Sequence, residues 1–270
     1  MTAFVKSALR RERTIVAATL TLVVLIACAY TLAGVGMEMS AISMTFSGGD
    51  GMGAMAMGSM KTPMAGDWSW TRFLLMFAMW WLMMVAMMLP SAAPAVLLYA
   101  SVLKRGGAAT TARPALVFTA GYLLAWAVFS LLATAAQMWL EISGLVSRST
   151  MMLVGGQAGA MVLIAAGIYQ FTSLKDRCLT LCRAPAEFIA RHHRPGATGA
   201  LRLGTLHGAY CLGCCSVMMM LLFVGGVMNL FWIVGLAVFV ALEKLSSHGH
   251  LFTRISGGLL VGFGIAKWFL

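Results

Sequence analysis

The chain has 270 residues, of which 61% are hydrophobic and 10% are charged, and its formal net charge is +11. Because a soluble domain carries roughly 25% charged residues, this composition excludes an ordinary soluble protein. The sequence predicts an all-α fold, a polytopic bundle of about seven transmembrane helices (six to eight) in a lipid bilayer.

The positive charge is unevenly distributed. Most of the 19 Lys and Arg residues lie in four clusters: Lys6 to Arg13, Lys104 to Arg113, Lys175 to Arg202, and Lys244 with Arg254. These clusters fall in the N-terminal tail and in every second connection between the expected crossings. All four therefore lie on the same, cytoplasmic side, as the positive-inside rule requires. Topology therefore explains the basicity, so the N-terminus is predicted to be cytoplasmic and no nucleic-acid partner is expected.

Residues 1–36 are expected to form a basic cytoplasmic tail and a first transmembrane helix, which begins near Thr14. A removed signal peptide is the alternative, with Leu25 to Cys28 resembling a lipoprotein cleavage site. The apolar run continues past Cys28, however, whereas the apolar core of a signal peptide spans only about 7–15 residues.

Residues 37–67 form a segment rich in methionine, glycine, serine and alanine, which we expect to be a flexible outer loop because it has too little bulk to build a core. Its methionines are Met37, Met39, Met44, Met52, Met55, Met57, Met60 and Met64. Exposed thioethers that bury nothing are suited to capturing Cu(I). The alternative is a low-complexity linker.

Residues 68–270 are predicted to form the helix bundle. Its first apolar run, from Phe73 to Leu103, places a stripe of methionines on one helical face, with Met84 and Met88 beside it. The stripe consists of Met76, Met79, Met83 and Met87. Packing is the ordinary explanation of such a stripe, and relay of a metal ion from the outer loop is the functional one.

The next two helices are expected from Pro114 to Leu140 and from Met151 to Thr172, followed by a cytoplasmic loop at 174–202. This loop carries Cys178 and Cys182, whose four-residue spacing places both thiols on one face if the segment is helical. They are candidates for an inner metal hand-off site, or simply two thiols beneath the membrane surface.

The most informative stretch lies between Arg202 and Glu243, which contains no Lys, Arg, Asp or Glu and is long enough for two crossings with a turn near residues 225–229. Its first helix carries His207, Cys211, Cys214 and Met218 on one stripe, flanked by Cys215. Imidazole, thiol and thioether donors suit Cu(I) best and zinc less well. Packing and thiol redox chemistry are the alternatives.

Several sequence blocks carry a resemblance to a known family. They are Met87-Met88-Leu89-Pro90-Ser91, Leu174-Lys175-x2-Cys178-Leu179-x2-Cys182-Arg183, Gly208-x2-Cys211-x-Gly213-Cys214-Cys215, Gly226-x-Met228-Asn229-Leu230 and Glu243-Lys244. Over about residues 70 to 265, the chain resembles a bacterial family of integral membrane proteins of unknown function that is described as predicted metal-binding. The resemblance implies metal handling in the bacterial inner (cytoplasmic) membrane and specifies no reaction.

These observations favour a non-enzymatic membrane protein that acquires Cu(I) at the outer side and relays it across the membrane or to a partner, either a metallochaperone or a larger membrane complex. One alternative is a thiol redox protein that uses Cys211 and Cys214, which have dithiol spacing. Another is an accessory subunit of a membrane complex that performs no chemistry.

Overall fold

The computed structural model describes residues 3–34, 41–46, 68–108, 110–148, 150–246 and 249–269. Throughout this part of the chain the regular elements are helices, joined by one isolated β-bridge between Val146 and Leu153, so the predicted all-α class is confirmed. The helices are α1 (Ala3–Ala33), α2 (Ala41–Phe46), α3 (Trp70–Arg105), α4 (Ala112–Ile142), α5 (Gly156–Tyr169), α6 (Ser173–Arg183), α7 (Pro185–His192), α8 (Gly196–Met219), α9 (Leu222–Gly225), α10 (Leu230–Leu245) and α11 (Gly249–Phe269).

Four of the described helices are long and apolar enough to cross a membrane. They are Thr14–Ala33 of α1, α3, α4, and the span Gly196–Gly225 that joins α8 to α9. A fifth crossing results if α5 and α6, which meet at 64°, count as one broken span. The expected seven crossings therefore exceed the helices that qualify. One reason is that the second half of the chain contains shorter helices, of which α5 has 14 residues and α10 has 16, against the roughly 20 that a crossing needs.

The outer surface of these helices is strongly apolar. Leu22 of α1 is 58% exposed, Leu132 of α4 is 64% exposed and Leu259 of α11 is 68% exposed. Large apolar side chains on several faces are unusual for a soluble monomer. The surface therefore suits contact with lipid chains.

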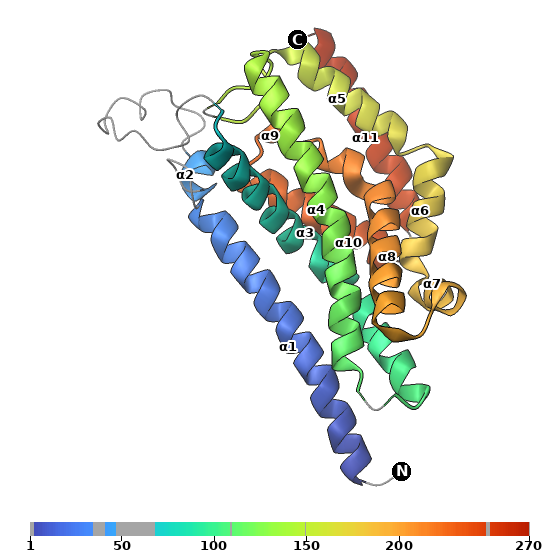
Figure 1. Ribbon diagram of the computed structural model, residues 1–270. Helices are drawn as coiled ribbons and strands as arrows, with labels where there is room; N and C mark the ends of the chain where they lie inside the picture. Colours follow the sequence, from blue (N-terminus) through green and yellow to red (C-terminus); the bar gives the residue numbers. More distant parts are fainter. Residues whose placement is uncertain are drawn as a thin grey trace.

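Three helix pairs organise the bundle: α4 packs on α8, α5 on α11, and α1 on α3. Figure 1 shows α1 lying along the outside of α3 and α4, with the two chain termini at opposite ends of the molecule. In this arrangement α3, α4 and α8 surround the most deeply buried side chains, which include Trp80, Tyr122 and Cys214.

The ends of two helices that position the site follow from local sequence. Ser69 caps α3 by accepting a hydrogen bond from the backbone N–H of Arg72, and α3 then continues through Pro90 and Pro94 without a break. Gly226 has a φ of 94°, a left-handed conformation that glycine adopts without steric cost. Asn229 then caps α10, so the turn that the sequence predicts near 225–229 is present.

The methionine-rich segment at 37–67 falls largely outside the described residues. Its described part is α2, where the Thr45 hydroxyl accepts a hydrogen bond of 2.9 Å from the backbone N–H of Leu230 at the start of α10. The outer-capture role of its methionines remains a prediction.

Close packing of α4 on α8 depends on glycine. A Cβ atom at Gly204 would clash with the backbone carbonyl of Phe118, and one at Gly121 would clash with that of Leu201. The two backbones therefore approach as small residues permit in membrane helix pairs. This contact sets the position of the cysteines about two and three turns further along α8.

We expect Gly204→Ala to lower the free energy of unfolding by about 1–3 kcal/mol, because the added methyl group must separate α4 from α8. The measurement is the thermal unfolding midpoint of the detergent-solubilised protein. Gly235→Ala is the control, since a Cβ there meets open space and alanine favours the helix. Equal midpoints for the two variants would show that the α4–α8 contact adapts freely.

Candidate metal centre

Three sulfur atoms meet in the core between α8 and α3. The Cys211 and Cys215 sulfurs are 3.9 Å apart, and the Cys215 sulfur is 3.9 Å from the Met88 sulfur. The two cysteines share a face of α8 because they are four residues apart, and Met88 approaches from α3. All three side chains are at most 1% exposed. We call Cys211, Cys215 and Met88 the core sulfur cluster.

The two 3.9 Å sulfur–sulfur spacings, Cys211 to Cys215 and Cys215 to Met88, are compatible with a bound metal ion. An ion at about 2.3 Å from each of three sulfurs in a trigonal plane would hold the sulfurs about 4 Å apart. Thiolate and thioether donors are the soft ligands that select Cu(I). The donor set therefore fits copper in both distance and chemistry.

Two polar side chains contact the Cys211 sulfur, and one of them is also bonded to a third. The Lys244 ammonium of α10 lies 2.9 Å from the Cys211 sulfur, and the Tyr122 hydroxyl of α4 lies 3.2 Å from it. Lys244 also donates to the Ser91 hydroxyl at 3.3 Å. Sequence reasoning placed Lys244 among the topology-setting charges, named Ser91 only as the end of a block that carries the family resemblance, and did not identify Tyr122. The sequence signal that could have identified Lys244 was the Glu243-Lys244 block, which helps to carry the family resemblance but was given no function.

A second pair of sulfurs lies between α6 and α8. The Cys214 and Cys182 sulfurs are 3.9 Å apart, and Cys182 is partly exposed whereas Cys214 is buried. We call Cys182 and Cys214 the α6–α8 thiol pair. Cys178 lies beside it, since its sulfur would be 2.5 Å from a Cβ added at Gly213. Glycine at 213 therefore lets α6 approach α8 closely enough for the pair to form.

The predicted cysteine stripe on α8 divides between these two groups. Cys211 makes its sulfur contact with Cys215, while Cys214 makes its own with Cys182. Both Cys214 and Cys215 donate their thiol hydrogens to the Cys211 carbonyl, at 3.1 and 2.8 Å. One backbone carbonyl thus links the two sulfur groups.

His207 and Met218, the remaining α8 candidates, have different surroundings. The His207 ring lies among the rings of Phe118, Tyr122 and Phe188, with centroids 5.4–5.9 Å away. Its Nδ1 atom is buried and lacks a hydrogen-bond partner among the described residues. An unsatisfied buried nitrogen calls for a further partner such as water or an ion, so His207 stays a candidate ligand.

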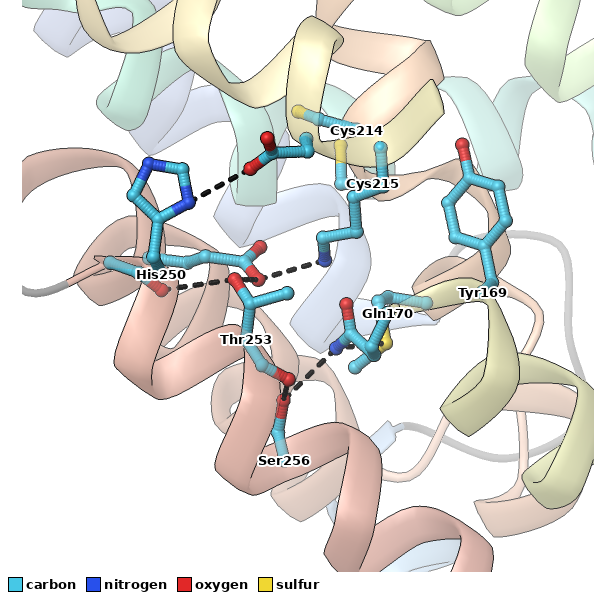
Figure 2. Close-up of polar contacts among 12 residues, drawn as sticks. Tyr169, Gln170, Cys214, Cys215, His250, Thr253 and Ser256 are labelled. Atoms are coloured by element: carbon cyan, nitrogen blue, oxygen red, sulfur yellow. Dashed lines mark hydrogen bonds and ion pairs between the residues drawn. The ribbon is translucent and has the colours of Figure 1, made fainter. Parts of the chain in front are cut away.

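Met218 is engaged by an amide. Its sulfur lies 3.2 Å from the Gln170 side-chain nitrogen, which also donates to Ser256 of α11 at 3.1 Å. Figure 2 shows the Gln170 amide reaching Ser256, with Cys214 and Cys215 nearby on α8. Met218 is therefore held at the boundary between the sulfur groups and α11.

The methionine stripe of α3 faces the interior. Met76, Met79, Met83 and Met87 are all at most 4% exposed. Met76 accepts a contact of 3.7 Å from the amide of Gln137, which belongs to a buried network with Glu141 and Arg72. Met88, beside the stripe, is the methionine whose sulfur joins the cysteines.

Within the described residues, no three His, Cys, Asp or Glu side chains come together closely enough to hold a metal ion. The cysteine sulfurs are arranged in pairs, and the third donor of the core sulfur cluster is a methionine. A site of this kind requires a metal that accepts thioether ligands and low coordination numbers, as Cu(I) does.

A buried ion pair fixes the helix that carries Lys244. Glu243 and Lys175 are fully buried, and their charged groups are 2.8 Å apart. Thr253 of α11 donates to the same Glu243 oxygen at 2.6 Å. Because Glu243 is tied to α6 and α11, the next residue along α10 is directed toward the sulfurs of α8.

A comparison with family models gives a match over most of the chain. A family model described as PpoB2, copper chaperone, matches residues 77–267, which is more than half of the chain. No curated protein and no solved structure matches. The matched region contains the core sulfur cluster, the α6–α8 thiol pair and Lys244. The chain therefore belongs to the PpoB2 copper chaperone family.

Proposed function

We propose that this protein is a multi-pass membrane copper chaperone of the bacterial inner membrane, which takes up Cu(I) at the outer side, holds it at the core sulfur cluster and passes it to a partner. The carrying observation is the pair of 3.9 Å sulfur spacings that join Cys211, Cys215 and Met88 inside an apolar bundle. Copper is the cargo in this proposal, and zinc is the less favoured metal.

The proposed path begins at the methionine-rich segment and follows the α3 stripe to Met88. Thioethers bind Cu(I) without adding charge, so a series of them lets an ion move, whereas two thiolates hold it more firmly. The buried positions of Met76 to Met87 support this order. His207 and Met218 flank the holding site.

The proposed exit is the α6–α8 thiol pair. Cys182 is partly exposed and its sulfur lies 3.9 Å from that of the buried Cys214, so this pair can present copper to a metallochaperone or a larger membrane complex. Cys178 adds a third thiol nearby. The description of the family supports a carrier role without catalysis.

The α6–α8 thiol pair is also the pair of cysteines that a thiol redox function would use. Its two sulfurs come from different helices and are in contact, whereas Cys211 and Cys214 turn to different partners. A redox function would therefore use Cys182 with Cys214. A reducible bond between them in metal-free protein, with no copper bound under reducing conditions, would support it in place of copper handling.

The first prediction concerns copper binding. The purified protein should bind Cu(I), and a Cys211→Ser/Cys215→Ser variant should bind it at least about 10–100-fold more weakly, because two of three donors are lost. Metal analysis and competition with a Cu(I) chelator measure this. Cys28→Ser is the control, since Cys28 lies on α1. Unchanged affinity in the double variant would contradict the proposed holding site.

The second prediction separates two adjacent methionines. Met88→Leu should weaken Cu(I) binding several-fold while preserving the fold, because leucine is close in volume to methionine but offers no sulfur. Met87→Leu serves as the matched comparison, since both residues are buried on α3. Equal effects in the two variants would assign the loss to packing.

The third prediction concerns release. Cys182→Ser should leave the Cu(I) affinity of the core sulfur cluster unchanged but slow the transfer of copper to a water-soluble thiol acceptor. Stopped-flow measurement of the transfer rate tests this, with Thr180→Ala, an exposed position on the same helix, as control. A normal rate in Cys182→Ser would exclude the α6–α8 thiol pair as the exit.

A further inference from the structure

Lys244 is unusual because its charge is buried in an apolar bundle without a carboxylate partner among the described residues. Its ammonium reaches the Cys211 sulfur at 2.9 Å and the Ser91 hydroxyl at 3.3 Å, and the residue is 9% exposed. The buried carboxylates nearby in sequence or space have other partners: Glu243 pairs with Lys175 and Glu141 pairs with Arg72.

Six titratable groups from three helices surround the Lys244 ammonium: His207, Cys211, Cys214 and Cys215 of α8, Cys182 of α6 and Tyr122 of α4. The Cys211 sulfur is in direct contact with it at 2.9 Å, so the negative charge that can balance Lys244 is thiolate charge. A buried cation without compensation is strongly unfavourable. The fold therefore places a fixed positive charge against the donors of the core sulfur cluster.

We propose that Lys244 makes the core sulfur cluster selective for a monovalent metal ion, so that it favours Cu(I) over Zn(II) through charge balance. This inference rests on the proposed function. The thiolates of Cys211 and Cys215 carry two negative charges in the metal-bound site, and the Met88 thioether carries none. Cys214 remains a neutral thiol that donates its hydrogen to the Cys211 carbonyl. Lys244 and Cu(I) supply one positive charge each, which leaves the site neutral. With Zn(II) in place of Cu(I), the site keeps one uncompensated positive charge.

The contact with Lys244 is compatible with metal binding by Cys211. A thiolate sulfur has three lone pairs, so it can accept a hydrogen bond and bind a metal at the same time. Hydrogen bonds to ligand atoms tune metal affinity in other sites. Lys244 thus acts as a positioning and charge-balancing residue, while the sulfurs bind the ion.

The test compares Cu(I) and Zn(II) affinities of the full chain in detergent, each measured by chelator competition. In Lys244→Met the ratio of Cu(I) to Zn(II) affinity should fall by about 10–100-fold, with Zn(II) binding strengthened. Lys104→Met, which removes a positive charge at the far end of α3, should leave the ratio unchanged.

A second variant neutralises the charge of Lys244 without removing its side chain. Ser91→Asp places a carboxylate beside the ammonium, so Lys244 no longer balances the thiolates and the ratio should fall in the same direction. If Lys244→Met does not fold, the ratio of Cu(I) to Zn(II) affinity in Ser91→Asp tests the inference.

Two results would overturn the inference in distinguishable ways. If both metals bind more weakly in Lys244→Met and Ser91→Asp with an unchanged ratio, Lys244 is a structural residue and the copper-holding site stands. If the unmodified protein binds no Cu(I) at all, the proposed function fails together with the inference.

Discussion

The structure depends on keeping ionic groups neutralised inside an apolar bundle. The Lys244 ammonium contacts the Cys211 sulfur, and the adjacent Glu243 pairs with Lys175. These two contacts attach α10 to α8 and α6 at neighbouring residues. An unpaired charge inside the bundle would be costly. The two contacts together therefore fix the rotation of α10 about its axis and its position along α8 and α6. The geometry of the sulfur donors follows from that constraint.

Close approach of backbones supplies the second constraint. Glycines at 121 and 204 bring α4 against α8, and Gly213 brings α6 against α8 beside Cys178. As a result, cysteines on one helix meet sulfurs from two others, Met88 of α3 and Cys182 of α6. The central position of α8 thus explains why one short stretch of sequence contributes to both sulfur groups.

The two sulfur groups differ in ways that suit a carrier. The core sulfur cluster is fully enclosed and has a cation beside it, whereas the α6–α8 thiol pair includes the partly exposed Cys182. An enclosed site protects Cu(I) from water and oxidants, and a more open pair allows exchange with a partner. Membership of a copper chaperone family agrees with this division.

The sequence by itself determined the helical class, the apolar surface, the turn at Gly226 and the soft donor types, because composition and 3.6-residue periodicity depend on local chemistry. It also identified Cys211, Cys214 and Cys215 as residues of one helix. The number of crossings did not follow, since the short α5 and α10 read as full spans when only apolar runs are considered.

Tertiary structure alone decided which donors meet. Periodicity gives the direction of a side chain around its own helix, but the neighbouring helix on that side depends on packing. Cys214 therefore joined Cys182 in place of Cys211, and Met88 joined the cysteines in place of its neighbour Met87. From the sequence, Lys244 looks like a charge at a membrane surface. It turns inward because the ion pair of Glu243 with Lys175 orients α10, and because the Cys211 sulfur accepts a hydrogen bond from its ammonium group.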